Sequence, residues 1–135
     1  MQSYILLIIV DEKQDSDFIN EAMQGAGLAC VSAWVDSRER VLRVLSQMLP
    51  DFILLDLGLR NMNGLAFLEE LKSSEMTCEI PVFLYCNPTP DEMKKKALDL
   101  GAAAFIERTV NAEILSWALK SAIQDSEYRK DEKID

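Results

Sequence analysis

The chain has 135 residues, which is enough for one domain with a real core and too few for two. Hydrophobic residues make up 49% of it and charged residues 27%, as in ordinary globular proteins. The formal net charge of -9 makes the chain a poor nucleic-acid binder by itself, because phosphates repel it. Cations and basic partners are the natural counterparts of such a chain.

Cysteine and histidine usage argues against a zinc site. There is no histidine, and Cys30, Cys78 and Cys86 show no CxxC spacing. Reduced thiols in a cytoplasmic protein are therefore expected. The N-terminal segment MQSYILLIIVD has no basic stretch and only a short apolar run, so neither a signal peptide nor a membrane span is predicted.

The first elements along the chain are a strand and a helix. Tyr4–Val10 is a continuous apolar run, which predicts a strand covered on both faces. Asp15 or Ser16 is expected to cap the following helix, and Gly25 and Gly27 to end it. The apolar face of this helix carries Phe18, Ile19, Ala22 and Met23.

Two further strands follow, with a helix between them. The strands are Ala29–Val35 and Phe52–Asp56. The helix is expected to have Asp36 or Ser37 as its cap and to stop at Pro50. Its apolar positions are Val41, Leu42, Val44, Leu45 and Met48.

The next predicted elements are a helix, a strand and another helix. The third helix carries Leu65, Leu68 and Leu71 at helical spacing. Val82–Cys86 is the fourth strand. The fourth helix starts near Pro90 and runs to Leu100, with Gly101 as its left-handed stop.

The end of the chain predicts a fifth strand, Ala103–Glu107, and a last helix. The helix has a regular apolar period made by Ile114, Leu115, Ala118, Leu119, Ala122 and Ile123. Residues 125–135 are charged and lose that period. This tail is interpreted as a solvated helix end, a terminus or the start of a linker.

Strand and helix alternate five times, which predicts an α/β fold with a doubly wound sheet of five parallel strands and helices on both faces. Ligands of such sheets bind beyond the carboxyl ends of the strands. The residues expected at those ends are Asp11 and Glu12, Asp56, Cys86 and Asn87, and Glu107, Arg108 and Thr109.

The carboxylates of Asp11, Glu12 and Asp56 would meet at this edge of the sheet. At about 4 Å and an effective dielectric of about 20, one such repulsion costs about 4 kcal/mol, which a divalent ion relieves. Oxygen ligands in a small open site favour Mg²⁺, and Arg108 suits phosphate recognition. The set predicts that Asp56 is a nucleophile that becomes phosphorylated. The alternative is that Asp11 and Asp56 only cap the loops after their strands.

Four segments make the sequence similar to the receiver domains of two-component response regulators. They are LLIIVDEKQDS, PDFILLDLGLRNMNG, IPVFLYCN and ALDLGAAAFIERTV. The resemblance extends from Tyr4 to Gln124 and implies a flavodoxin-like sheet of order 2-1-3-4-5. It assigns residues 1–124 to a receiver domain and leaves 125–135 as a charged tail or the start of a linker.

The resemblance also implies roles for individual residues. Mg²⁺ would be held by Asp11, Glu12, Asp56 and the backbone carbonyl of Gly58. Asp56 would accept a phosphoryl group from a histidine kinase or a histidine phosphotransfer protein, with Arg108 neutralising the transferring group. The implied protein is a signalling domain, not an enzyme, and a monomer or weak homodimer. Its downstream partner would be a protein or an output domain, without direct contact to nucleic acid or membrane.

Several residues depart from the family pattern. Cys86 stands where the family usually has Thr or Ser, whose hydroxyl binds the new phosphoryl group, and a thiol is a weaker and longer donor. Arg108 replaces the usual lysine and Thr109 the proline after it, while Phe105 keeps the aromatic residue that the switch moves. Arg60 replaces another proline, which is expected to loosen its loop.

Two other functions stay open. One is a degenerate receiver that acts as a phosphorylation-independent protein-binding module. The other is a Mg²⁺-dependent phosphohydrolase, which needs a second acid two residues after its nucleophile, where this chain has Gly58. The resemblance also implies that partners dock along the fourth helix, the fifth strand and the fifth helix. Lys94–Lys96 are either a solvated helix face or part of that docking surface. Trp117 either packs at the edge of the core or contacts a partner.

Overall fold

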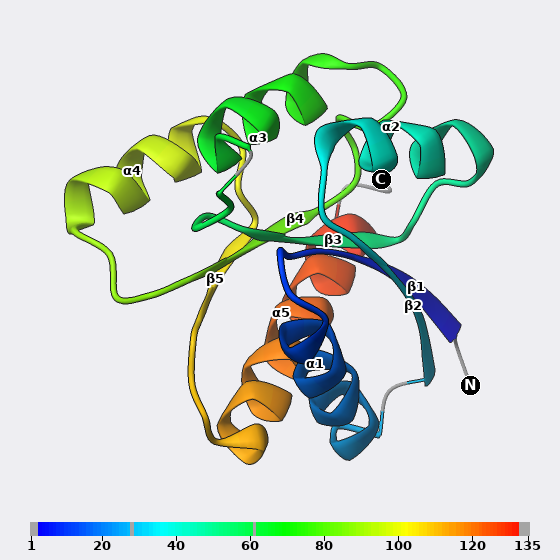
Figure 1. Ribbon diagram of the computed structural model, residues 1–135, viewed down its shortest axis with the longest axis vertical. Coiled ribbons are helices and arrows are strands. Elements are labelled where there is room, and N and C mark those ends of the chain that lie inside the picture. The colour runs from blue at the N-terminus through cyan, green and yellow to red at the C-terminus, as the bar shows by residue number, and fades with distance from the viewer. Residues whose placement is uncertain (1–2, 28, 61, 133–135) are drawn as a thin grey trace.

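The computed structural model describes residues 3–27, 29–60 and 62–132, and it is built of three layers, with helices on both sides of a central sheet (Figure 1). Five parallel strands lie in the order β2-β1-β3-β4-β5, as predicted. The strands are β1 (Ser3–Ile9), β2 (Ala29–Val35), β3 (Phe52–Asp56), β4 (Val82–Cys86) and β5 (Ala104–Glu107). The helices are α1 (Lys13–Gly25), α2 (Arg38–Gln47), α3 (Gly64–Ser73), α4 (Asp91–Asp99) and α5 (Ala112–Glu132).

Each face of the sheet has its own hydrophobic core. Helices α1 and α5 cover one face, and α2, α3 and α4 cover the other (Figure 1). Successive strand residues point to opposite faces, so Leu7 and Ile9 pack towards α2 and α3, while Leu6 and Ile8 pack towards α1 and α5. Both faces of the sheet are therefore covered by helices and shielded from solvent, which explains why the strands are unbroken apolar runs in the sequence.

Helix α1 begins earlier than predicted. Its first residue is Lys13, with Glu12 in the extended cap position, and the N–H of Asp15 donates to the Glu12 carbonyl at 3.1 Å. The prediction that Asp15 or Ser16 caps this helix is therefore wrong. Asp15 lies in the first turn instead, where its charge faces the positive end of the helix dipole. This early start places Asp15 above the carboxyl ends of the strands.

The other helix ends follow the predicted chemistry. The Ser37 side chain caps α2, one of the two residues predicted to do so, and Asn63 caps α3. Pro90 occupies the cap position of α4, and Gly101 after that helix has a φ of +107°. A side chain at Gly101 would be strained in that left-handed conformation, so glycine is needed there.

Helix α5 continues into the charged tail. It runs to Glu132, and among its residues up to 129 the buried side chains are Leu115, Leu119, Ala122 and Ile123, with Ala118 partly buried beside them. Ile114, which was expected on that face, is exposed, and so is Trp117, with 71% of its surface accessible. The packed face, which lies against α1 and the sheet, is narrower than the apolar period suggested. The domain boundary at residue 124 stays a prediction. Within the described part of the chain, no helix is both long and apolar enough to span a bilayer.

Candidate functional site

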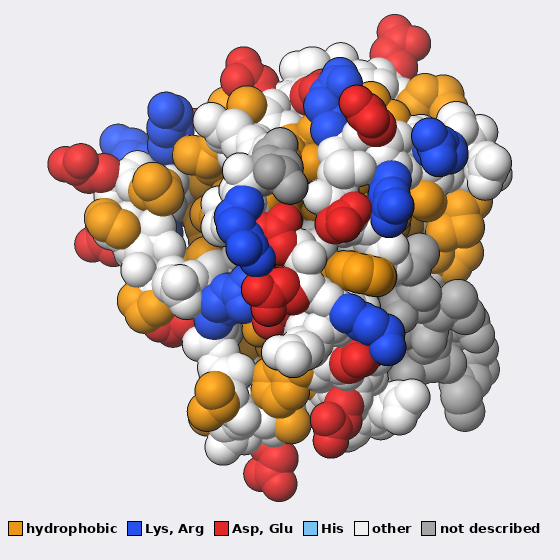
Figure 2. All heavy atoms as spheres, in the orientation of Figure 1, with side chains coloured by type: hydrophobic (Ala, Val, Ile, Leu, Met, Phe, Trp, Pro, Cys, Tyr) orange, Lys and Arg blue, Asp and Glu red, His pale blue; other side chains and the backbone are white. Residues whose placement is uncertain are grey.

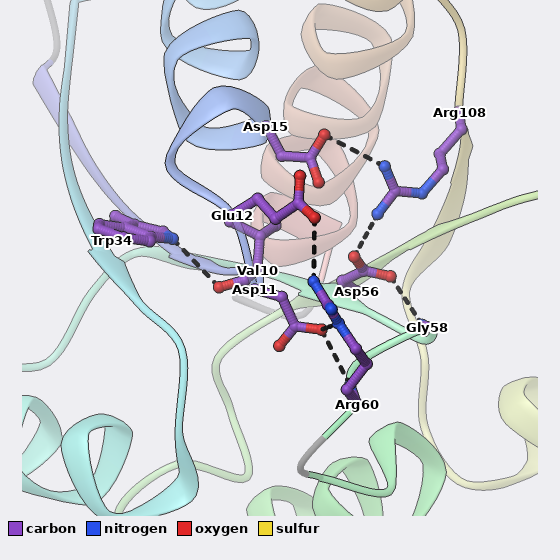
Figure 3. A network of polar contacts seen from close by, with 9 residues as sticks. All are labelled: Val10, Asp11, Glu12, Asp15, Trp34, Asp56, Gly58, Arg60 and Arg108. Carbon is purple, nitrogen blue, oxygen red and sulfur yellow. Dashed lines mark hydrogen bonds and ion pairs between the residues drawn. The ribbon is translucent and has the colours of Figure 1, made fainter.

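Carboxylates and arginines from distant parts of the chain meet beyond the carboxyl ends of β1, β3 and β5 (Figure 3). We call the four acids the acidic cluster; they are Asp11, Glu12, Asp15 and Asp56. The two arginines are Arg60 and Arg108. The ion pairs form two neighbouring groups: Arg60 contacts Asp11 and Glu12, and Arg108 contacts Asp15 and Asp56. On the face shown in Figure 2, acidic and basic side chains likewise lie next to one another.

Asp56 is the most buried member of the cluster, with 3% of its surface exposed. It is the last residue of β3 and lies beside Tyr85 of β4. The backbone N–H of Gly58 donates to Asp56 Oδ1 at 2.7 Å, and Arg108 Nη2 donates to Asp56 Oδ2. Burial raises the pKa of Asp56 above the usual carboxyl value, and the Gly58 and Arg108 donors limit that rise. The carboxylate is thus held in one orientation.

Arg108 follows β5 and is fixed from three sides. Its Nη1 donates to Asp15 Oδ1 at 3.3 Å, its Nη2 pairs with Asp56, and its Cζ lies 4.5 Å from the centroid of the Tyr85 ring. Its backbone N–H donates to the carbonyl of Cys86 at 2.7 Å. Burial alone would lower the pKa of Arg108, but the attraction of Asp56 and Asp15 outweighs it and the pKa is raised. The site therefore contains a permanent positive charge in a defined position.

Arg60 binds the other two acids. Its backbone N–H donates to Asp11 Oδ2 at 2.9 Å, and its Nη2 donates to Glu12 Oε1 at 2.9 Å. Its Nε lies 3.7 Å from the same Asp11 oxygen. These contacts tie the loop after β3 to the end of β1, and the expectation that Arg60 loosens this loop relative to proline stays a prediction.

The predicted metal ligands reach the same edge of the sheet, but they do not form one set. Among the residues described, no three acidic or sulfur side chains converge closely enough to hold a metal ion. Arg60 pairs with Asp11 and Glu12, whereas Asp56 pairs with Arg108. Four carboxylates against two guanidinium groups still leave a net charge of -2. Oxygen donors with that charge fit Mg²⁺, provided that Arg60 moves off its two acids.

Two glycines keep the loop after β3 close to Asp56. A Cβ on Gly58 would lie 3.3 Å from Asp56 Oδ1, the oxygen that accepts the Gly58 N–H. A Cβ on Gly64 would lie 3.0 Å from Leu57 Cδ2 and 3.2 Å from Leu57 Cα. The start of α3 could not approach the residue after Asp56 this closely with a larger side chain.

The proposed switch residues flank the network. Cys86 is buried at the end of β4, where it pairs in register with Glu107 and accepts the Arg108 N–H through its carbonyl. Phe105 is half-buried and packs against the core under α2, α3 and α4, with Lys94 Nζ 6.0 Å from its ring centroid. Cys86 thus contacts Arg108 through the backbone, Phe105 precedes it by three residues on β5, and their switching role stays a prediction.

Sequence reasoning missed Asp15 and Tyr85 as partners of Arg108. Asp15 was expected to cap a helix, and Tyr85 was regarded only as part of an apolar strand. Two signals could have identified them. A helix that starts directly after β1 brings its first turn to the site, and parallel pairing places Tyr85 opposite Asp56.

Fold and site together define a doubly wound α/β domain with an acidic, arginine-bridged site at the carboxyl edge of its sheet. The sequence pattern of the response regulator receiver domain matches residues 6–120, so the chain belongs to that family. Such domains are signalling modules of two-component systems and not classical enzymes. They interact with histidine kinases and output domains, and they bind a divalent metal in general.

The chain is also similar to individual proteins. It is 28% identical over 119 residues to the phosphate regulon transcriptional regulatory protein PhoB of Pseudomonas aeruginosa. The aligned region covers 88% of this chain and 51% of PhoB. The chain therefore spans about half the length of that relative.

Two solved structures share the fold. The phosphorylated cyanobacterial phytochrome response regulator RcpA has a TM-score of 0.76 and 24% identity, over 89% of this chain and 91% of RcpA. The Mn²⁺-bound form of response regulator Rcp1 has a TM-score of 0.73 and 20% identity, over 87% of this chain and 90% of Rcp1.

Proposed function

We propose that this chain is a phosphorelay receiver that accepts a phosphoryl group on Asp56 from a histidine kinase or a histidine phosphotransfer protein. The observation that supports this proposal is the environment of Asp56. Its carboxylate is buried at the end of β3, oriented by the Gly58 N–H and paired with Arg108. Phosphoryl transfer depends mainly on positioning and on stabilisation of charge, and both are present here.

In the proposed reaction, one Asp56 carboxylate oxygen attacks the phosphorus of a phosphohistidine. The P–O bond forms as the P–N bond breaks, and the released imidazole nitrogen takes up a proton from solvent. Arg108 turns Nη2 from Asp56 to a phosphoryl oxygen, while Asp15 and the Tyr85 ring keep its guanidinium in place. Mg²⁺ at Asp11, Glu12, Asp56 and the Gly58 carbonyl would neutralise charge on the phosphoryl oxygens when bound.

The metal and phosphorylation parts of the proposal have support from relatives of the same fold. RcpA was solved in a phosphorylated form, and Rcp1 was solved with Mn²⁺. The oxygen-only donors and the net charge of -2 in the acidic cluster suit Mg²⁺ equally well.

The output is proposed to run through Cys86 and Phe105 to a partner surface on α4, β5 and α5. Two exposed apolar side chains support this surface, namely Met93 on α4 and Trp117 on α5. We propose that the partner is a downstream protein or an output domain, and that the chain itself is a monomer or weak homodimer in the cytoplasm.

Intact-protein mass spectrometry after incubation with acetyl phosphate and Mg²⁺ tests the central claim. The wild-type chain should gain one phosphoryl group that is stable in acid and labile in base. Asp56→Asn should gain none. Asp17→Asn removes an exposed acid on α1 and should react like the wild type, since Asp17 pairs only weakly with Lys13 at 3.9 Å.

One observation favours a second function, the phosphorylation-independent binding module. Arg60 and Arg108 already neutralise half of the charge of the acidic cluster, so the site is held together by residues of the chain itself. If neither acetyl phosphate nor phosphoramidate forms an adduct in the presence of Mg²⁺, this second function replaces the first.

A further inference from the structure

Arg60 lies at the part of the acidic cluster where a divalent cation is proposed to bind (Figure 3). Its guanidinium contacts Glu12 Oε1 through Nη2 at 2.9 Å and approaches Asp11 Oδ2 through Nε at 3.7 Å. We propose that Arg60 is an intramolecular competitor of the metal. The guanidinium occupies the oxygens of Asp11 and Glu12 and must leave before a divalent ion binds, so Arg60 sets the metal affinity. This inference rests on the proposed function, because it concerns the same site.

The competition follows from charge and from shared donors. A guanidinium and a metal ion need the same carboxylate lone pairs, and two cations at that separation repel each other. Occupation by Arg60 therefore has to be reversed before Mg²⁺ can reach both acids.

Of the two arginines, Arg60 is the one that can leave its acids before a phosphoryl group is present. Its side chain is 72% exposed, so it can turn into water, and Asp11, whose side chain is 15% exposed, keeps the hydrogen bond from the Arg60 backbone N–H. The Arg108 side chain is 28% exposed and is held by Asp15, Asp56 and the Tyr85 ring. Displacing Arg108 would leave the buried Asp56 carboxylate without its counter-charge, which is far more costly.

The backbone of Arg60 has a separate role. Its N–H donates to Asp11 Oδ2 at 2.9 Å, and this bond does not depend on where the side chain lies. A proline at this position, the residue usual in the resembling family, would lack that donor. Arg60→Gln keeps the N–H and removes the charge, so it isolates the contribution of the guanidinium.

The test compares Mg²⁺ binding by the 135-residue wild-type chain, Arg60→Gln and Arg38→Gln. Arg38 is the matched control, because its guanidinium makes a two-point ion pair with Glu70 between α2 and α3, outside the acidic cluster. Calorimetry and Trp34 fluorescence follow binding; the Trp34 indole N–H donates to the carbonyl of Val10, next to Asp11. Arg60→Gln should bind Mg²⁺ roughly threefold to tenfold more tightly than the wild type, and Arg38→Gln should stay within about twofold.

NMR of the arginine Nε–H groups gives a readout that does not depend on affinity. The Arg60 resonance should shift as Mg²⁺ is added to the wild type, because its guanidinium leaves Asp11 and Glu12. The Arg38 resonance should stay in place, since its partner Glu70 is not part of the site.

Each outcome separates this inference from the proposed function. Mg²⁺ binding by Arg60→Gln but not by the wild type would be the strongest support. If the wild type binds Mg²⁺ and Arg60→Gln binds it equally or less tightly, the competition is overturned but the metal site is not. The same holds if Arg38→Gln increases the Mg²⁺ affinity as much as Arg60→Gln does. Absence of Mg²⁺ binding in all three proteins overturns both the inference and the metal part of the proposed function.

Discussion

Arg108 and Arg60 are two arginines that each pair with two acids, yet they lie at different depths. Arg108 is 28% exposed and its partner Asp56 is buried, whereas Arg60 is 72% exposed and contacts the exposed Glu12 and the partly buried Asp11. Water screens the Arg60 pairs, and the protein interior screens the Asp56 pair much less. An arginine–carboxylate ion pair is therefore expected to be a fixed part of the structure where it is buried, and to be replaceable by another cation where it is exposed.

The largest expected effect in this comparison is that of Arg108→Gln on stability. The substitution leaves the Asp56 carboxylate buried without its counter-charge, which should lower the free energy of unfolding by about 2–4 kcal/mol at neutral pH. Urea denaturation of the variant and the wild type measures the loss. The double variant Arg108→Gln with Asp56→Asn should recover much of it, because no buried charge then remains. A loss below about 1 kcal/mol would show that depth does not separate the two arginines.

A smaller effect, dependent on pH, is expected for Asp56→Asn in metal-free buffer. Burial raises the pKa of Asp56 in the folded chain, so its stabilising contribution is full below the pKa of the unfolded chain and is lost as the pH rises through the folded pKa. The variant should therefore become increasingly more stable than the wild type from acidic to neutral pH. Urea denaturation between about pH 3.5 and about pH 7.5, with chelator present, measures the trend. The opposite trend would show that the Gly58 and Arg108 donors outweigh burial.

Cys86→Thr probes whether the buried half of the network also carries the switch. A neutral hydrogen bond contributes about 0.5–1.5 kcal/mol, and a thiol should supply only part of that. With beryllofluoride as the phosphoryl mimic, the wild type should shift incompletely and Cys86→Thr should shift further, with unchanged Mg²⁺ affinity. NMR of the Phe105 region measures the shift in both proteins. Cys78→Ser, which changes the other free cysteine described, is the control. Complete switching in the wild type would make the thiol argument wrong.

The smallest expected effect is that of Arg60→Gln on stability. Exposed ion pairs contribute about 0.2–1 kcal/mol, and the N–H bond to Asp11 is retained. The free energy of unfolding should fall by less than about 1 kcal/mol, and high salt should remove most of the difference. Urea denaturation at low and high salt measures this effect. A cost as large as that of Arg108→Gln would mean that Arg60 is not free to leave its acids.

Local patterns explain which parts of the fold were predictable. Strands β3 and β4 were predicted with their observed ends, because an apolar run between polar residues is a local signal. The start of α1 was not, since Asp15 is a good cap by composition but the helix begins as soon as β1 ends. The apolar period correctly predicted helix α5, but it did not predict which apolar side chains are buried, since Ile114 is exposed.

The candidate site shows the same division. Asp11, Asp56 and Arg108 could be assigned to one edge of the sheet, because parallel strands place their carboxyl ends together. The arginine that pairs with each acid could not be assigned, because every acid of the cluster follows a strand or begins a helix and the sequence does not distinguish between them. The conclusion that Arg60 fastens its loop likewise needed the distances to Asp11 and Glu12.

The sequence by itself determined the alternation of strands and helices, the acids after β1 and β3, and the glycine after α4, because these depend on hydrophobic period and backbone conformation within a few residues. Only the tertiary structure decided which arginine neutralises which acid and how deeply. Arg108 and Asp15 are 93 residues apart, and Arg60 and Glu12 are 48 apart. Coulomb energies depend on distance and on burial, and both are properties of the folded chain that no neighbouring residue specifies.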